Sequence, residues 1–367
     1  MGSYDTPDLI NPLHPSVVDK VDPIYADIYT RYQAPRVRAD QVPYEVYNKD
    51  RKKYSFPTYL VTGSAPEVAS STIYQVPVSS PPGEIDVQVY MPTADAVAEG
   101  GLATTPAGLL PVLVDFHGGG FVIGGLQDDD VLCRNLCQRA GCAIVNVAYR
   151  TAPEHPHPTP VLDSWEALNW VFASAERLGL DASRVAVSGL SAGGCIAAVL
   201  AVLARDARPA LPPLALQLLI VPVIDARHVP REGPAAPDCP YGSYRALEFA
   251  PSLPLARLSW FYNYWLGTGT DEAGREARAR DFRASPILAE SHAGLAPASI
   301  RCAGVDPLVD EGAAYHAKLS EAGTPSKIKI YKGQGHPFGQ WGGANPAARE
   351  FTEDCVNDLK EAFAKKS

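Results

Sequence analysis

The stretch from Arg184 to Asp206 reads RVAVSGLSAGGCIAAVLAVLARD and predicts a short strand, a tight turn and a long helix. Between the strand and the helix, residues 189–193 (GLSAG) match the pattern G-x-S-x-G. At such a turn the serine is held in a strained conformation with its Oγ exposed, because the flanking glycines have no Cβ atoms to clash. The N–H groups at the start of the helix favour negative charge beside this hydroxyl.

A serine hydroxyl is a weak nucleophile at neutral pH, so Ser191 needs a general base and a carboxylate that orients this base. In one class of enzymes whose nucleophile sits on such a strand-to-helix turn, the acid and then the histidine follow in chain order, each after a strand. Asp306 follows an expected strand over 299–303, and His336 follows one over 327–331 in a glycine-flanked loop. We therefore predict that Ser191, Asp306 and His336 form a catalytic triad.

A second carboxylate, Asp310, competes with Asp306 for the place beside the histidine. Asp310 lies four residues further from the strand, where the next helix is expected to begin and where aspartate is a common cap. A turn or cap role is also the alternative for Asp306. Its shorter distance from the strand end favours Asp306 as the catalytic acid.

The glycine run in His117-Gly118-Gly119-Gly120-Phe121 directly follows an expected buried strand over 111–116. Ordering three consecutive glycines costs conformational entropy, which makes sense where the backbone must approach a substrate closely. A loop in this place supplies backbone donors to the reacting carbonyl. We predict that the N–H groups of Gly118, Gly119 and Ala192 form an oxyanion hole.

Strands and helices alternate downstream of residue 110, which predicts a mostly parallel sheet covered by helices on both faces. Segments 72–79 and 85–91 alternate in the manner of antiparallel strands, and residues 92–110 are expected to form a surface loop. The remaining strands are expected at 143–147, 184–188 and 214–221, and the helices at 128–140, 161–178, 192–205, 311–322 and 347–364.

Two segments fall outside this alternation and divide the chain into a core and a lid. Residues 1–60 are rich in Pro and Tyr, and residues 226–282 surround an aromatic cluster. We expect both segments to form a lid over an α/β core made of 61–225 and 283–367. Packing without substrate contact is the alternative for each aromatic or apolar side chain that we expect in the pocket, namely Phe121, Leu190, Trp260, Phe261, Tyr264, Tyr29 and Phe338.

The motifs at 117–120 and 189–193, the segment 149–156 (YRTAPEHP) and the contexts of Asp306 and His336 together resemble the hormone-sensitive-lipase-like family of α/β-hydrolases. The resemblance implies an eight-stranded, mostly parallel sheet flanked by helices, with a helical lid. It also implies carboxylesterase activity on small to medium acyl esters without a cofactor, and a loop-shaping rather than proton-transferring role for the histidine at 117. Many members carry Asp or Thr where this chain has Leu190, so the resemblance says less about subgroup and substrate.

Two other functions use the same scaffold. Small-molecule receptors similar to the gibberellin receptors lack an intact triad, and the presence of His336 in its motif counts against this reading. A tailoring hydrolase that cleaves a lactone, thioester or other acyl group of a secondary metabolite shares the whole machinery. The sequence leaves this alternative open, because the pocket decides the substrate.

Composition and charge exclude several classes of partner. The 367 residues carry a formal net charge of −9 with no basic tract, which argues against nucleic acid and anionic membranes. The longest apolar runs are too short to span a bilayer, so we expect no stable membrane insertion. The N-terminus lacks the apolar region of a signal peptide, and a cytoplasmic location is expected. An exposed strand edge near 327–331 makes a homodimer plausible by family resemblance.

Seven cysteines occur without a disulfide framework, and several of them lie in apolar contexts that predict buried thiols. Cys133 with Cys137, and His155 with His157, have no further ligands at metal-binding spacing, so we expect no metal site. Met1-Gly2 with Thr6 fits the loose myristoylation pattern, an alternative that so short a match leaves open.

Overall fold

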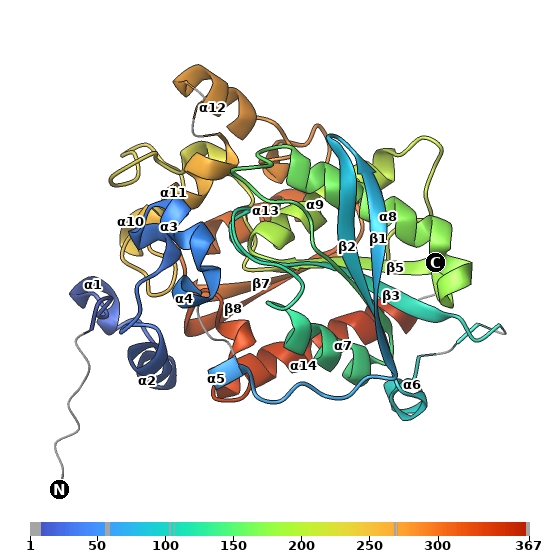
Figure 1. Cartoon of the computed structure of the whole chain (residues 1–367). Helices are drawn as coiled ribbons and strands as arrows, with labels where there is room; N and C mark the ends of the chain where they lie inside the picture. The colour runs from blue at the N-terminus through green and yellow to red at the C-terminus, as the bar shows by residue number, and fades with distance from the viewer. Residues whose placement is uncertain are drawn as a thin grey trace, which may run out of the picture.

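A single twisted sheet forms the centre of the computed structural model (Figure 1). The structure describes residues 9–55, 59–102, 104–105, 107–267, 269 and 271–364. Within these ranges eight strands pair in the order β1-β2-β4-β3-β5-β6-β7-β8. Pairing is antiparallel where β1 meets β2 and where β2 meets β4, and parallel elsewhere. The strands are β1 Ser70–Ser79, β2 Pro82–Met91, β3 Leu110–Phe116, β4 Ala143–Val147, β5 Leu180–Leu190, β6 Leu216–Ile220, β7 Ala298–Val305 and β8 Ser326–Gly335.

The inner strands are short, continuous apolar runs because both of their faces are covered by helices. Every residue of β3, β4 and β6 is buried. Helices α8, α9 and α13 cover one face of the sheet, and α7 and α14 cover the other (Figure 1). The bounds of these helices are α7 Asp130–Ala140, α8 Thr159–Leu178, α9 Ala192–Asp206, α13 Val309–Glu321 and α14 Pro346–Ala364.

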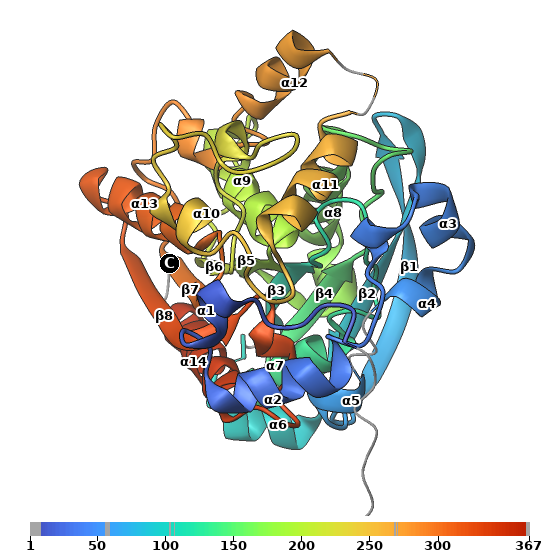
Figure 2. The same cartoon turned by 90° about the vertical axis from the view of Figure 1, so that its left-hand side faces the viewer.

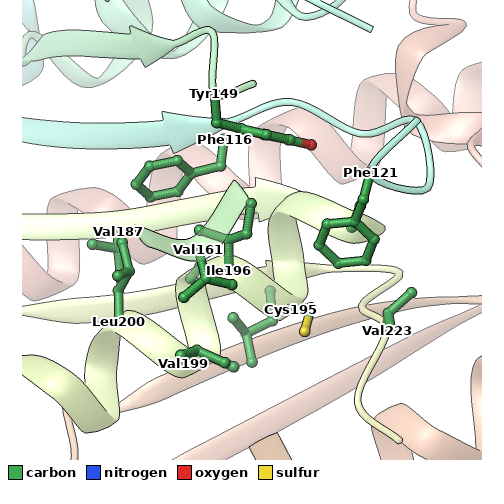
Figure 3. Packing of buried hydrophobic residues seen from close by; sticks show 14 of the residues in the cluster. Phe116, Phe121, Tyr149, Val161, Val187, Cys195, Ile196, Val199, Leu200 and Val223 are labelled. Carbon is green, nitrogen blue, oxygen red and sulfur yellow. The ribbon is translucent and has the colours of Figure 1, made fainter. Parts of the chain in front are cut away.

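The core beneath α8 and α9 is packed by aliphatic side chains from the sheet and the two helices. Figure 3 shows Val187 of β5 against Val199 and Leu200 of α9, with Val161 of α8 nearby. These side chains have no exposed surface. Burial of this kind stabilises the fold by about 25 cal/mol for each Å² of apolar surface removed from water. The helix that follows Ser191 is thereby held rigidly against the sheet.

The segments that we expected to form a lid gather at one end of the sheet (Figures 1 and 2). Tyr25 and Ser252 join them through a hydrogen bond of 3.0 Å between their hydroxyl groups, and Lys20 Nζ donates to the carbonyl of Ala246. The boundaries at residues 60, 226 and 282 stay predictions. The elements are α1 Pro15–Val18, α2 Pro23–Tyr32, η1 Ala39–Gln41, α3 Tyr44–Lys49, α4 Arg51–Tyr54 and α5 Tyr59–Thr62, followed later by η2 Ala226–His228, α10 Gly242–Ala246, α11 Leu255–Trp265 and α12 Glu272–Ala279.

One expected loop contains a helix, so the prediction for residues 92–110 is wrong. Helix α6 occupies Ala94–Gly100. The side chain of Thr93 accepts a hydrogen bond from the N–H of Ala96, and Gly101 ends the helix with a left-handed φ of 69°. An N-cap threonine and a glycine just past the last turn are helix start and stop signals, and alanine favours the residues between them.

All seven cysteines are buried and unpaired, whereas the sequence predicted buried thiols for several of them. In the part of the chain that the structure describes, no group of three or more His, Cys, Asp or Glu side chains could hold a metal ion. Among those residues, no helix has both the length and the hydropathy that a bilayer crossing requires. Strand β8 lies at the edge of the sheet, and the homodimer and the cytoplasmic location stay predictions. Met1, Gly2 and Thr6 lie outside the described residues.

Candidate active site at the carboxyl end of the sheet

Ser191 occupies the sharp turn between β5 and α9. Its backbone has φ 58° and ψ −110°, a conformation that is costly for a residue with a side chain. The turn is held in place by neighbouring backbone, because the N–H of Ser191 donates to the carbonyl of Ile220 at the end of β6. Gly189 is required by packing, since a Cβ there would lie 2.2 Å from the carbonyl carbon of Gly193. The motif is therefore the strained strand-to-helix turn that its pattern predicts.

Asp306 and His336 follow directly after two neighbouring parallel strands, β7 and β8. Nδ1 of His336 lies 2.8 Å from Oδ2 of Asp306, and the two residues are 6% and 1% exposed. The other oxygen of Asp306 accepts the N–H of Leu308. Asp310 is occupied elsewhere, since its carboxylate accepts the N–H of Ser243. The structure thus places Asp306, rather than Asp310, against the imidazole.

Ser191 and His336 line the same cavity, which has a volume of about 290 Å³. Its wall combines the glycine loop, the nucleophile turn, α11 and residues from the N-terminal segment. Of the side chains that we expected in the pocket, Leu190 and Phe261 belong to this wall. The remaining lining residues are Gln33, Tyr47, Arg51, Ser55, Gly118, Gly119, Gly120, Ile123, Gly124, Asp128, Val223, Ser252, Leu253, Arg257, Leu258, Tyr262, Pro337, Gln340 and Trp341.

Two of the expected pocket residues belong instead to the hydrophobic core. The ring of Phe121 is stacked on Trp265 with centroids 3.8 Å apart and is fully buried. Phe338 packs between Tyr331 and Phe351. For these two positions the alternative reading, packing without substrate contact, is the correct one.

Three further pocket predictions fail because of the direction in which the side chains point. Along α11, Leu258 and Phe261 face the cavity, whereas Trp260 and Tyr264 contact each other on another face of the helix. Tyr264 also packs on Tyr44 of α3. Tyr29 lines a smaller neighbouring cavity, and its hydroxyl donates to the carbonyl of Asn11. Helix periodicity separates these faces, but docking of α11 decides which of them meets the cavity.

Two backbone N–H groups of the glycine loop, residues 118–120, have no hydrogen-bond acceptor among the described residues. Gly119 and Gly120 have φ of 112° and 60°, values that favour glycine. In the described part of the chain, the N–H groups of these two glycines and of Ala192 have no hydrogen-bond partner. Gly118 stays a predicted donor, and Gly120 adds a further N–H group in the same loop.

His117 supports the loop from behind. Its Nδ1 lies 2.7 Å from the carbonyl oxygen of Gly118 and donates to it, and its ring is stacked on Tyr149 at 4.1 Å. The hydroxyl of Tyr149 donates to the carbonyl of His117 itself. Burial lowers the pKa of His117 to about 4, so the ring is neutral at pH 7. These contacts agree with a loop-shaping histidine.

Comparison with known proteins places this geometry in a family. A family model described as the alpha/beta hydrolase fold matches residues 113–340. A protein of Schizosaccharomyces pombe, "AB hydrolase superfamily protein C1039.03", is 34% identical over 99% of this chain and 100% of its own length. "Carboxylesterase NlhH" of Mycobacterium tuberculosis is 38% identical over 69% of this chain and 74% of its own length. This chain belongs to the hormone-sensitive-lipase-like family of α/β-hydrolases.

Solved structures agree with membership of the hormone-sensitive-lipase-like family. An α/β-hydrolase enzyme from the metagenome of Lake Arreo superposes with a TM-score of 0.78 at 31% identity, covering 95% of this chain and 100% of the other. A structure named "Bacterial Heroin Esterase" superposes with a TM-score of 0.75 at 28% identity, covering 95% and 99%. The family resemblance and the fold that the sequence predicted are both confirmed.

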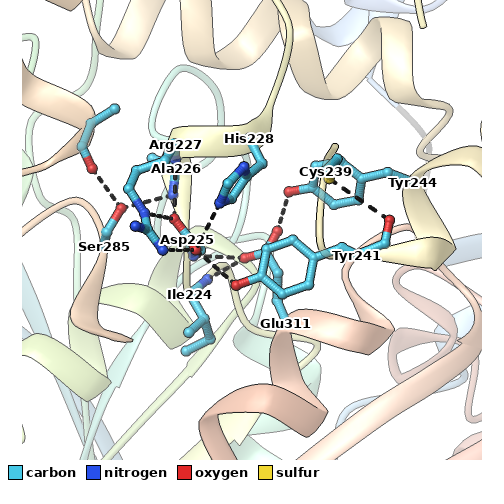
Figure 4. Close-up of polar contacts among 11 residues, drawn as sticks. Ile224, Asp225, Ala226, Arg227, His228, Cys239, Tyr241, Tyr244, Ser285 and Glu311 are labelled. Atoms are coloured by element: carbon cyan, nitrogen blue, oxygen red, sulfur yellow. Dashed lines mark hydrogen bonds and ion pairs between the residues drawn. The ribbon is translucent and has the colours of Figure 1, made fainter. Parts of the chain in front are cut away.

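A buried polar network, which the sequence did not point to, surrounds Ile224 and Asp225 after the end of β6 (Figure 4). Oε2 of the Glu311 carboxyl group in α13 accepts the N–H groups of Ile224 and Asp225, each at 2.7 Å, and Oε1 is hydrogen-bonded to the hydroxyl of Tyr244. The N–H of the preceding residue, Val223, donates to the carbonyl of Ser191 at 3.2 Å. Glu311 therefore fixes the backbone that leads from the nucleophile into the insertion.

The two carboxyl groups of this network carry different charges. Burial and the nearby Asp225 carboxylate raise the pKa of Glu311 to about 8, so Glu311 is mostly protonated at pH 7. Burial also acts on Asp225, but hydrogen bonds from Arg227 and Tyr241 outweigh it and hold the pKa of Asp225 below its usual value. The network thus places one negative charge, on Asp225, beside the Arg227 guanidinium.

A cationic side chain in the cavity wall also escaped the sequence prediction. Arg257 lies four residues before Phe261 on α11, so the two side chains share one face of the helix. This spacing was the available sequence signal, because Phe261 was already expected in the pocket. The four-residue spacing predicts that Arg257 and Phe261 lie on the same face of a helix, but it does not predict that this face lines a cavity.

Proposed function

We propose that this chain is a serine carboxylesterase that hydrolyses small to medium acyl esters through an acyl-enzyme intermediate. The observation that carries the proposal is the cavity lined by Ser191 and His336, with His336 hydrogen-bonded to Asp306. Relatives named carboxylesterase, ethyl acetate hydrolase and esterase support the class of reaction. The shape and charge of the cavity determine the substrate and its acyl length, whereas the relatives indicate only the class of reaction.

In the proposed reaction, Oγ of Ser191 attacks the ester carbonyl while His336 accepts the hydroxyl proton. The tetrahedral intermediate collapses, the bond to the alkoxy group breaks, and His336 delivers the proton to the leaving alcohol. Water then attacks the acyl-enzyme with the same base, and the acid is released with Ser191 restored. Asp306 accepts the Nδ1 proton of His336, which leaves the other ring nitrogen free to act as the base.

Developing charge on the carbonyl oxygen needs donors that are already in place. We assign this role to the N–H groups of Gly118, Gly119, Gly120 and Ala192. Those of Gly119, Gly120 and Ala192 lack a protein acceptor among the described residues. The start of α9 adds the positive end of its dipole at the same point. Loss of one such donor costs about 10²–10³ in rate in other hydrolases.

Hydrolysis of a p-nitrophenyl ester of a short-chain acid tests the proposal. We expect activity in the wild type and a loss of roughly 10⁴-fold or more in Ser191→Ala. Ser320→Ala, which removes an exposed hydroxyl on α13, is the matched control and should retain activity. A fluorophosphonate probe should label the wild type at Ser191, as mass spectrometry of the peptides would show. Full activity in Ser191→Ala would make the nucleophile assignment wrong.

The same machinery serves lactones and thioesters, so the substrate screen includes both classes. A wild type that binds small ligands but turns over no ester, lactone or thioester would favour the receptor alternative. The contact between His336 and Asp306 supports catalysis over a receptor, because a carboxylate that holds an imidazole in the cavity shared with Ser191 serves proton transfer and adds nothing to ligand binding.

A further inference from the structure

A guanidinium lies in the wall of the catalytic cavity where it is largely shielded from water. Arg257 of α11 lines the cavity that contains Ser191, and its side chain is 18% exposed. It also lines the smaller neighbouring cavity beside Gln33 and Tyr29 of α2. Arg257 therefore lies between the two cavities, where the N-terminal segment meets the insertion.

The protein compensates the charge of Arg257 only in part. Its Nε lies 3.2 Å from Oδ1 of Asp40 but out of hydrogen-bond alignment, and its Nη1 donates to the carbonyl of Ser252. Asp40 is shared, because Arg38 approaches the same carboxylate with two nitrogens, each at 3.2 Å. Among the described residues, Nη2 of Arg257 has no hydrogen-bond partner. One carboxylate thus faces two guanidinium groups.

Other basic side chains increase this positive character. Arg51 lines the main cavity and is hydrogen-bonded to the side chain of Asn48, not to a carboxylate. Arg36 and Arg38 line the neighbouring cavity. The acidic residue among the described lining residues of the main cavity is Asp128, from the loop before α7. A concentration of arginines is unusual in a chain of net charge −9 and attracts anions into the cavity.

Burial of an incompletely paired charge is costly, and a bound anion offsets this cost. Desolvation lowers the pKa of Arg257 below its usual value, the direction expected for a cation that lacks full compensation. Arginine also presents its donors in a planar fork that matches a carboxylate. The group best suited to Nη2 is therefore a carboxylate or a similar small oxyanion.

The position of Arg257 relative to the reacting atoms sets where this anion lies on a substrate. The guanidinium carbon is 5.5 Å from the ring centre of Phe261, one turn further along α11. That ring packs against the glycine loop, since a Cβ at Gly120 would lie 2.3 Å from it. The Phe261 ring therefore lies between the Arg257 guanidinium and the glycine loop, and an anion bound by Arg257 lies at the far end of a substrate from the scissile carbonyl.

We propose that Arg257 is a specificity-determining residue that binds an anionic group at the far end of the ester substrate. The inference rests on the proposed esterase function and narrows it to esters that carry a carboxylate, such as half-esters of dicarboxylic acids. Arg257 acts in substrate binding and takes no part in the proton transfers at Ser191.

The test compares two matched esters, monoethyl adipate and ethyl hexanoate, which differ in the charge at the end of the acyl chain. The ratio of their kcat/KM values is measured by release of ethanol in the wild type, Arg257→Gln and Arg257→Lys. A second pair, 4-acetoxybenzoate and phenyl acetate, places the anion on the alcohol side. We expect the wild type to favour the anionic member of at least one pair, and Arg257→Gln to lower that ratio by about tenfold or more, mainly through KM.

Arg257→Lys keeps the charge and should retain part of the preference. Arg280→Gln removes an exposed cation just after the last residue of α12 and is the matched control, with an unchanged ratio. Asp40 keeps Arg38 as a partner in Arg257→Gln, which favours folding of the variant. The wild type offers an independent measurement, because its preference for the anion should weaken as salt rises from about 0.05 M to about 0.5 M.

The outcomes separate this inference from the proposed function. If the neutral esters are hydrolysed but neither ratio responds to Arg257→Gln, Arg257 only joins the two lid segments and the inference is overturned. If Arg257→Gln lowers kcat/KM equally for both members of a pair, the inference is likewise overturned. If the wild type hydrolyses neither neutral nor anionic esters, the esterase proposal fails and takes this inference with it.

Discussion

The α-carbon of Gly193 faces the carbonyl oxygen of Phe116 so closely that a Cβ at position 193 would lie 1.8 Å from that oxygen. Phe116 is the last residue of β3, and the glycine loop begins at the next residue. Gly193 belongs to the first turn of α9, directly after the nucleophile turn. This contact fixes the distance between the nucleophile and the loop that carries the proposed oxyanion donors.

Gly193→Ala should therefore separate the two parts of the site. Because the obstructing atom belongs to the backbone, no side-chain rotation relieves the clash. We expect the free energy of unfolding to fall by about 3 kcal/mol or more. Activity per folded molecule should fall as well. Gly125→Ala is the matched control, since a Cβ at Gly125 meets nothing within 4 Å. Chemical denaturation and esterase assays on both variants give the answer, and equal behaviour of the two would disprove the packing argument.

Asp306→Asn should reduce kcat by roughly 10³–10⁴-fold with little change in stability, since a neutral amide does not stabilise the imidazolium and its NH₂ group can donate to Nδ1 and select the wrong tautomer of His336. Asp310→Asn alters a carboxylate of similar sequence context that binds the N–H of Ser243 instead. This control variant should keep most of its activity. Steady-state kinetics decide between the two acids, and the opposite order of effects would restore Asp310 as the catalytic residue.

Glu311 makes stability depend on pH. Its pKa is raised from 4.5 to about 8 in the folded chain, so between these values the folded state holds a proton that the unfolded state has lost. The free energy of unfolding then falls as pH rises, by about 1.4 kcal/mol for each pH unit contributed by this group. Glu311→Gln resembles the protonated acid and should lack this contribution, so its stability relative to the wild type should rise from pH 5 to pH 8.

Denaturation of Glu311→Gln and the wild type across this pH range provides the measurement. Glu99→Gln removes an exposed carboxylate on α6 and controls for the change in net charge. Glu311→Ala leaves the N–H groups of Ile224 and Asp225 without their acceptor and should be strongly destabilised at every pH. A stability difference between Glu311→Gln and the wild type that is constant with pH would contradict the raised pKa.

Phe121→Ala should act on stability rather than on substrate choice. The ring is fully buried against Trp265, so its removal leaves a cavity that costs about 3–5 kcal/mol. Phe261→Leu changes the wall of the catalytic cavity and should alter the preference among acyl lengths. Thermal unfolding and a series of p-nitrophenyl esters measure both effects. A changed acyl-length preference in Phe121→Ala, with normal stability, would return this residue to the pocket.

The sequence by itself determined the parts of this protein that depend on short-range pattern. Short apolar runs in alternation with helical segments predicted the parallel sheet, because strands covered on both faces must be apolar throughout. The pattern G-x-S-x-G predicted the strained turn at Ser191, because glycine at 189 and 193 has no other evident purpose between a strand and a helix. Chain order then pointed to Asp306 and His336 as the groups that follow the last two strands.

Only the tertiary structure decided how segments far apart in the chain meet. Docking of α11 against the core turned Phe261 toward the cavity and Trp260 away from it, although both lie in one aromatic run. The partial pairing of Arg257 with Asp40 joins the N-terminal segment to the insertion across more than half of the chain. Side-chain direction and charge compensation of this kind depend on which surfaces pack together. The local residue pattern does not predict this packing.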